Sequence, residues 1–133
     1  MRKSGTSPTA RTLKWLRDQG YDADKVEQPW NPHSKVTRDL YGFGDVLAFR
    51  DSAVVIVQVT STDNLASRHE KVAASPIARR WLNIPMAIRQ IELHGWALRG
   101  EAGKRKRWTL RRLSGRLASD GEILFDLMQE PQK

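Results

Sequence analysis

The stretch Arg38-Asp39-Leu40-Tyr41-Gly42-Phe43-Gly44-Asp45, followed after a short break by Val54-Val55-Ile56-Val57-Gln58-Val59-Thr60, determines how the rest of the chain is interpreted. Its two glycines permit a positive φ or a close approach of the backbone just before Asp45. The pattern predicts a strand over residues 46–49, a turn over 50–52 and a second strand over 53–59. Asp45 then begins one strand, and Gln58 and Thr60 end its neighbour.

The second predicted strand shows almost no polar alternation, which is typical of a central strand covered on both faces of a mixed sheet. Gln58 interrupts this apolar run, and a buried amide must find partners or it lowers stability. Two interpretations stay open, a core glutamine satisfied by the backbone and a functional group. A carboxylate on one strand that faces polar groups on the next can form a small metal site, so Asp45, Gln58 and Thr60 are the first candidate residues.

Periodicity and turn signals place the other elements. We expect helices over residues 8–19, 62–74 and 76–82, strands over 24–28, 87–98 and 105–113, and a short strand or helix over 122–128. Residues 29–34 are expected to be irregular because two prolines interrupt them. The predicted fold class is α/β, with a mixed central β-sheet flanked by helices. The length of 133 residues and the absence of a linker predict a single domain, 1–133, with flexible ends at 1–7 and 129–133.

The chain is strongly basic. It has 23 Lys and Arg against 15 Asp and Glu, a net charge of +8. Eight basic residues and one acid fall between Arg99 and Arg116, so the positive charge is clustered. Clustered charge favours a polyanionic partner, because neutralising phosphates releases counterions. The run Lys104-Arg105-Lys106-Arg107 is expected to bind phosphates from an exposed turn, while Trp96 and Trp108 are expected to pair across two strands.

Several classes of protein are disfavoured by composition. There is no cysteine, so disulfides and thiolate zinc sites are absent. No apolar run approaches the roughly 20 residues of a membrane span, and the first residues lack the apolar stretch of a signal peptide. We therefore expect no membrane association and a cytoplasmic location, which is the host cytoplasm if a phage encodes the protein.

The order helix, strand, strand pair with a polar end, helix and strands resembles the core of the PD-(D/E)XK nuclease superfamily. More closely, the chain is similar to small phage and prophage proteins described as Holliday-junction-resolvase-like. That resemblance covers roughly residues 15–113. The residues that carry it are Trp30-Asn31-Pro32-His33, Asp39-Leu40-Tyr41-Gly42-Phe43, Gln58-Val59-Thr60-Ser61, His94-Gly95-Trp96 and Arg107-Trp108.

The resemblance implies a restriction-endonuclease-like core in which an Asp and a Glu, or sometimes Gln, hold a divalent metal and a Lys two residues later helps to activate water. The matching positions are Asp45, Gln58 and Thr60, with the main-chain carbonyl of Val59 as a further metal ligand. Gln58 removes one negative charge from this site, and Thr60 cannot replace a lysine. Asp39 or Glu27 could restore a carboxylate.

The missing lysine has two candidate replacements, Lys71 and Arg68, on the helix that follows the second strand. Lys71 lies on the order of 13 Å along that helix from its start at 1.5 Å per residue, which makes its reach long. With the 104–107 turn and Arg38, Arg68 and Lys71 make up the predicted DNA-binding residues.

The implied function is that of a DNA endonuclease that uses Mg²⁺ or Mn²⁺, acts on DNA that includes branched structures, and works as a symmetric dimer. Two alternatives stay open. One is a DNA-binding module on the same fold that has lost cleavage, which Gln58 and Thr60 would explain. The other is a structural or protein-interaction component of a phage, whose basic charge serves solubility or nonspecific DNA contact.

Overall fold

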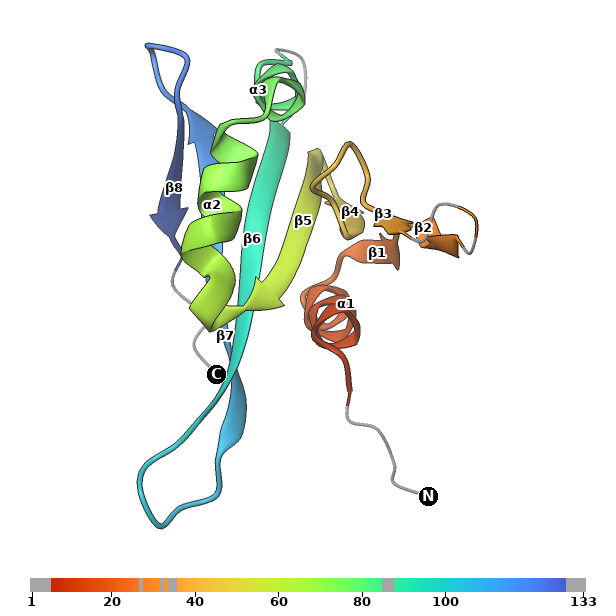
Figure 1. Cartoon of the computed structure of the whole chain (residues 1–133). Helices are drawn as coiled ribbons and strands as arrows, with labels where there is room; N and C mark the ends of the chain where they lie inside the picture. Colours follow the sequence, from red (N-terminus) through yellow and green to blue (C-terminus); the bar gives the residue numbers. More distant parts are fainter. Residues whose placement is uncertain (1–5, 27, 32, 34–35, 85–87, 129–133) are drawn as a thin grey trace.

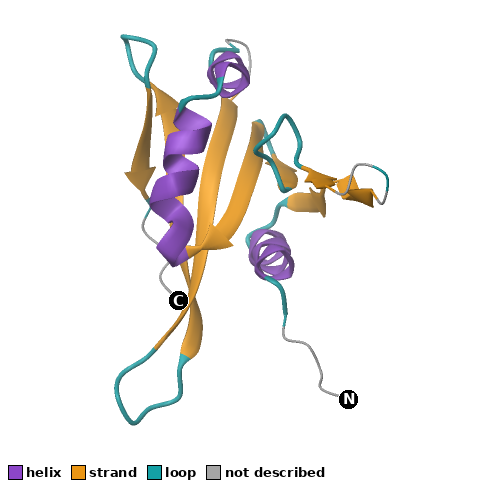
Figure 2. Cartoon of the chain, in the orientation of Figure 1, coloured by secondary structure: helices purple, strands orange, loops and turns teal. Residues whose placement is uncertain are grey.

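The computed structural model describes residues 6–26, 28–31, 33, 36–84 and 88–128. In this part of the chain a six-stranded mixed sheet is flanked by three α-helices, so the α/β class is confirmed. Figures 1 and 2 show α2 running along the sheet near β6 and β8, and α1 lying beside β1. None of the described helices combines the length and the apolar character needed to cross a membrane.

The sheet has the strand order β1-β4-β5-β6-β7-β8. Its members are β1 (Asp22–Lys25), β4 (Val46–Arg50), β5 (Ala53–Ser61), β6 (Ile88–Arg99), β7 (Arg107–Leu117) and β8 (Ile123–Leu127). β5 pairs antiparallel with β4 and parallel with β6, and the other neighbours are antiparallel. β5 is therefore the central strand that its apolar sequence predicted.

The two faces of β5 are covered by different helices. Val55, Val57 and Val59 pack in one cluster with Leu16 of α1 (Pro8–Asp18). Ile56, between them, points to the other face and packs with Leu65 and Val72 of α2 (Leu65–Ala73), and α3 (Pro76–Leu82) covers the same cluster. Because side chains alternate along a strand, Gln58 and Thr60 lie on the α2 face with Ile56.

The turn before β4 requires its glycines. Gly42 has a φ of +83°, and an added Cβ at Gly44 would lie 2.6 Å from Cγ2 of Ile56. The expectation of a positive φ or a close backbone approach is therefore met at these two positions. Leu40 and Gly44 exchange two backbone hydrogen bonds of 2.8 Å, which close the turn into a single antiparallel bridge.

Several sequence-based boundaries were wrong. The strand expected over 24–28 is β1 at Asp22–Lys25, and the segment expected to be irregular contains β2 (Gln28–Asn31), which pairs with β3 (Val36–Arg38) in a separate two-stranded sheet. A short two-stranded ribbon of irregular register tolerates Pro29, because proline has no N–H to donate and an edge strand can leave that position unpaired. The helix expected from residue 62 begins instead with a 3-10 turn, η1 (Thr62–Asn64), and neither η1 nor α2 has a side-chain cap.

The C-terminal half also differs from expectation. β7 continues to Leu117, beyond the predicted end at 113, and the 122–128 segment is the strand β8. Trp96 lies opposite Leu110, and Trp108 lies opposite Leu98, so the predicted Trp96–Trp108 pair is wrong. The predicted flexible ends fall mostly outside the described residues, but Ser7 is part of the helix cap, where its Oγ accepts a 3.1 Å bond from the Ala10 amide.

Candidate metal centre

Asp45 and Gln58 meet across β4 and β5. Asp45 precedes β4, and its N–H donates to the Val57 carbonyl at 2.9 Å, which places it opposite the end of β5. One carboxylate oxygen of Asp45, Oδ2, accepts from Gln58 Nε2 at 2.8 Å and from the Val59 N–H at 2.7 Å. Both residues are almost completely buried, Asp45 at 6% and Gln58 at 2% exposed. The structure thus brings the first two sequence candidates into direct contact.

The amide of Gln58 is only half satisfied. An ionised carboxylate can only accept hydrogen bonds, so the amide must present its NH₂ group to Asp45. Its carbonyl oxygen, Oε1, is buried and has no hydrogen-bond partner among the described residues. A buried acceptor without a donor costs on the order of 1–3 kcal/mol, so a donor or a cation at this oxygen would be stabilising.

Asp39 flanks the same turn as Asp45. Asp39 directly precedes Leu40, and Asp45 directly follows Gly44, so the two aspartates flank the Leu40–Gly44 bridge. In an antiparallel pair such positions face each other, so the turn directs both residues to one face. Asp39 is more open to solvent than Asp45, since its side chain is 20% exposed.

Lys71 reaches this turn from α2. Its Nζ lies 3.8 Å from Oδ2 of Asp39, in the loop before β4. Lys71 therefore contacts the site through Asp39 and does not have to extend back to the start of α2. Exposure decreases from Lys71 through Asp39 to the buried Asp45 and Gln58. These four residues form the carboxylate–amide site, which has one cation at its outer end.

The remaining predicted site residues lie as follows. Thr60 is 7% exposed on the same face as Gln58, and Val59 contributes its N–H to Asp45, while a role for its carbonyl stays a prediction. Glu27 lies outside the described residues, and Arg38 ends β3. Arg68 is half-buried on α2. In the 104–107 run, Lys104 pairs with Glu101 at 3.3 Å on the hairpin that joins β6 and β7, which projects from the body of the molecule in Figure 1.

The chemistry of the carboxylate–amide site is that of oxygen donors. The described residues contain no group of three or more His, Cys, Asp or Glu side chains that could hold a metal ion by themselves. Mg²⁺ is usually held by one or two carboxylates, with waters and substrate phosphates completing its shell. The Asp45 carboxylate, the unpartnered carbonyl of Gln58 and Asp39 at the opening fit that ligand preference.

A second buried polar cluster lies on the α1 face and was missed by the sequence analysis. Trp96 Nε1 donates to Thr12 Oγ1 at 2.9 Å, and this hydroxyl lies 3.1 Å from His94 Nδ1. His94 Nε2 lies 2.9 Å from Glu92 Oε1, which also accepts from Arg112 Nε at 2.9 Å. The signal that could have found it is the alternation of Glu92, His94 and Trp96 along one face of a strand.

The protonation of this cluster follows from its bonds. Burial raises the pKa of Glu92, but His94 and Arg112 outweigh burial and hold that pKa below its ordinary value. Burial lowers the pKa of His94, and the neighbouring Glu92 opposes this only in part. His94 is therefore neutral, with its proton on Nε2 facing Glu92 and with Nδ1 accepting from the Thr12 hydroxyl. The cluster is almost enclosed, with the Arg112 side chain 12% exposed, and it joins α1 to β6 and β7 as a structural element.

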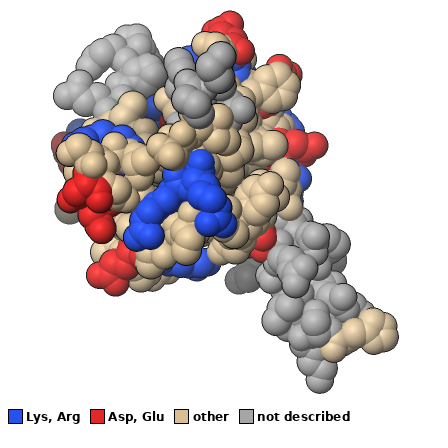
Figure 3. All heavy atoms as spheres, turned by 90° about the horizontal axis from the view of Figure 1, so that it is seen from above, with Lys and Arg blue, Asp and Glu red and all other residues tan. Residues whose placement is uncertain are grey.

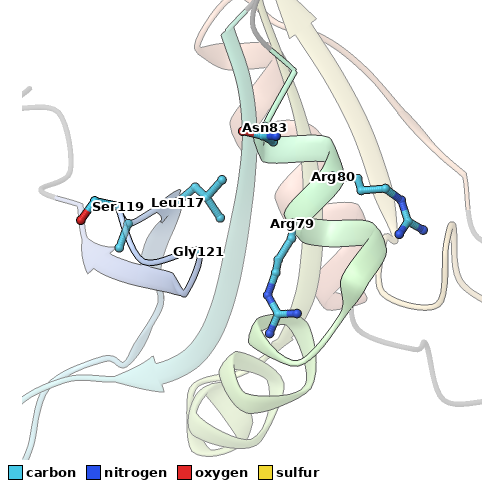
Figure 4. Close-up of a pocket in the computed structure, with 7 residues that line it drawn as sticks. Arg79, Arg80, Asn83, Leu117, Ser119 and Gly121 are labelled. Carbon is cyan, nitrogen blue, oxygen red and sulfur yellow. The ribbon is translucent and has the colours of Figure 1, made fainter.

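A hollow of about 400 Å³ lies at the α3 end of the sheet, distant in sequence from the carboxylate–amide site. Its lining includes Arg79 and Arg80 of α3 and Ser119 and Gly121 of the turn before β8. Figure 4 shows the Arg80 side chain pointing away from Ser119, and Arg79 donates to the Ala73 carbonyl at 3.4 Å. The two arginines do not converge, so this hollow offers no focused anion site.

In comparisons with protein-family models, with curated proteins and with solved structures, nothing matches this chain.

Proposed function

We propose that the protein is a metal-dependent DNA endonuclease with a restriction-endonuclease-like core. The observation that carries this proposal is the contact of Asp45 with Gln58 and the Val59 N–H across two neighbouring strands, beside a buried amide oxygen that no described residue satisfies. The order of elements supports it. Apart from β2, β3, η1 and α3, the chain runs through a helix, a strand, an antiparallel strand pair, a second helix and a strand parallel to β5, which are α1, β1, β4, β5, α2 and β6.

The residues present fit a hard divalent cation, Mg²⁺ or Mn²⁺. Asp45 and Gln58 would hold it, with Asp39 at the solvent side. When bound, such a cation orients and acidifies a water and stabilises the charge that develops on a phosphodiester. Lys71, the cation at the opening, would attract the phosphate and offset its charge. Burial of Asp45 and Gln58 strengthens each of these interactions by excluding water.

The charge of the chain supports a nucleic-acid substrate. The net charge is +8, and the hairpin between β6 and β7 carries Lys104, Arg105, Lys106 and Arg107 in exposed positions. On the face seen in Figure 3, Lys and Arg side chains gather near the centre, and Asp and Glu lie toward the edges of the view. Phosphate contacts of this kind position a strand without reading its sequence. Branched DNA and a dimeric arrangement remain part of the proposal through the family resemblance alone.

The test is cleavage of labelled duplex, single-stranded, flapped and four-way-junction DNA with Mg²⁺ or Mn²⁺. The Asp45→Asn variant keeps the shape of the side chain and removes its charge. Asp51→Asn is the matched control, since Asp51 lies in the exposed β4–β5 turn at a φ of 53°, which asparagine tolerates. We expect wild type and Asp51→Asn to cut and Asp45→Asn to bind without cutting. Equal cleavage by all three proteins would contradict the assignment of Asp45.

A DNA-binding module without cleavage is the second candidate. It is favoured by the 2.8 Å bond from Gln58 Nε2 to Asp45, which satisfies the carboxylate with an amide in place of a cation. Salt-sensitive binding to every DNA substrate, with no cleavage under either metal, would establish this alternative. Failure to bind DNA at all would favour a structural or protein-interaction role.

A further inference from the structure

A hollow of about 300 Å³ opens where β5 leaves the sheet and turns into η1. We call it the arginine hollow; its lining includes Thr62, Arg99, Thr109, Arg111, Leu127 and Met128. Thr60 is paired with Gly95, and Gly95 is paired with Arg111, so Arg111 lies two strands from Thr60 in the same row. Leu110 packs in the cluster on the α1 face, and Arg112 bonds to Glu92 on that same face. Arg111 lies between these two residues in β7, and side chains alternate along a strand, so Arg111 projects to the α2 face, as Gln58 does.

The polar groups of the arginine hollow are not used by the described part of the fold. Thr62 Oγ1 is buried, and no described residue forms a hydrogen bond with it. Arg99 and Arg111 have no ion pair, hydrogen bond or ring contact within the described residues. No acidic side chain lines the hollow.

Two other arginines of the same strand are neutralised. Arg112 donates to Glu92 at 2.9 Å, and Arg116 donates to Asp126 at 2.7 Å. Arg111 has no such partner in the described ranges, and Leu127 of the neighbouring strand lines the same hollow. Uncompensated positive charge is thus concentrated where a threonine hydroxyl also lacks a partner.

This combination matches a phosphodiester. Guanidinium groups remain charged at all ordinary pH values and bind phosphate oxygens through two parallel N–H donors. The Thr62 hydroxyl can donate to a further oxygen, and Leu127 and Met128 form an apolar wall that a sugar can contact. The volume lies at the lower limit of ligand sites, which suits one nucleotide unit of a longer strand.

We propose that the arginine hollow binds one phosphate of a DNA strand whose cleaved bond lies at Asp45 and Gln58. The inference rests on the proposed nuclease function. Thr62 lies four positions after Gln58, which is about 13 Å at the rise of an extended strand. The hollow therefore takes a phosphate a few nucleotides from the reacting one and fixes the path of the strand across the α2 face.

The experiment measures binding without cleavage, by fluorescence anisotropy of a labelled 20-nucleotide DNA, single-stranded or duplex, in EDTA. Three proteins are compared with wild type. Arg99→Gln/Arg111→Gln removes both charges of the hollow. Arg80→Gln/Arg116→Gln removes two charges from exposed sites elsewhere. Thr62→Val removes one hydroxyl and no charge.

We expect the Arg99→Gln/Arg111→Gln protein to bind about tenfold or more weakly near 0.1 M salt, with the slope of log Kd against log salt reduced by roughly two. The Arg80→Gln/Arg116→Gln control should lose much less. Thr62→Val should weaken binding several-fold with an unchanged slope, which a general loss of charge cannot produce. Thermal unfolding of each variant checks that the fold is intact.

Equal losses in the two double variants, or unchanged binding by Thr62→Val, would overturn the proposal. Because no metal is present, this result is independent of whether the protein cuts DNA. A protein that fails the cleavage test yet shows the predicted binding pattern would retain the phosphate subsite and lose only the nuclease assignment.

Discussion

The side-chain amide of Gln58 donates to Oδ2 of Asp45 at 2.8 Å, while the carbonyl oxygen of the same amide is buried and finds no hydrogen-bond partner in the described part of the chain. The NH₂ group of the amide thus has a partner in Asp45, whereas the carbonyl oxygen is left unsatisfied by the described residues. This asymmetry distinguishes the pair from an ordinary core glutamine, for which both ends are satisfied. It also makes the pair open to direct tests.

Gln58→Glu should make stability dependent on a divalent cation. The new carboxylate would lie against that of Asp45, and two adjacent carboxylates repel each other unless a proton or a cation lies between them. We expect a lower melting temperature than wild type in EDTA and a rise on adding millimolar Mg²⁺ or Mn²⁺ that exceeds the rise of wild type. Differential scanning fluorimetry measures both. The matched control is Gln19→Glu, at the half-buried C-cap of α1, which should show no cation-dependent rise.

Lys71→Ala should lower cleavage far more than it lowers stability. The Lys71–Asp39 pair is 3.8 Å long and partly exposed, so its loss should change the free energy of unfolding by less than about 1 kcal/mol. Its position beside the carboxylate–amide site predicts a loss of cleavage on the order of 10- to 100-fold, as for outer partners of a metal site. The measurement is single-turnover cleavage beside urea unfolding. Lys14→Ala is the control, because Lys14 forms a similar exposed pair with Asp18 on α1; equal cleavage by both variants would remove Lys71 from the site.

Stability should fall on acidification, first through His94. The pKa of His94 is lowered by burial, so its neutral form is favoured in the folded state. Its contribution is complete above the unfolded value of about 6.5 and is lost as the pH falls below it. The pKa of Glu92 is also lowered, so its contribution is lost in turn below about 4.5. Urea unfolding at pH 7.5, 6, 5 and 4 should show this decline.

The slope of the free energy of unfolding against pH shows whether His94 causes this decline. Between pH 6.5 and 5, unfolded wild type should bind more protons than the folded protein, and in a His94→Gln variant this excess should be smaller. If His94→Gln does not fold, Thr12→Val offers a second test. That substitution removes the hydroxyl between His94 and Trp96 and should cost on the order of 1–3 kcal/mol. A wild-type stability that stays level from pH 7.5 to 5 would contradict the assignment of a buried neutral histidine.

Gly95→Ala should loosen α2 from the sheet. An added Cβ would lie 2.6 Å from Cγ and Cδ1 of Leu65, the first residue of α2, so the helix or the strand must shift. Overpacking of this kind costs typically 1–3 kcal/mol. Urea unfolding measures the loss of stability, and Gly103→Ala is the control for replacing a glycine at a position without this clash. Gly103 has open space around it but a φ of +81°, so its cost should come from backbone strain alone and be smaller.

The sequence by itself determined the central hairpin and its surroundings. The unbroken apolar run of β5 requires cover on both faces, and α1 and α2 provide it. The glycines before Asp45 fixed a close turn, and the proline and serine at the start of α3 fixed a short helix whose bounds were predicted as they stand. These features follow from local rules, since period, turn chemistry and capping are set by residues close together in the chain.

Tertiary structure alone decided which polar groups meet. The Lys71–Asp39 contact joins a helix to a loop 32 positions earlier, and the Thr12–His94 contact spans 82 positions. No local pattern encodes such distances, because they depend on strand order and on the angle at which each helix crosses the sheet. Thr62 and the two arginines of the hollow come together for the same reason, through the pairing of β6 with β7 and the turn at the end of β5. The sequence determined which helix or strand carries each polar side chain, and packing then determined which of these side chains lie close together.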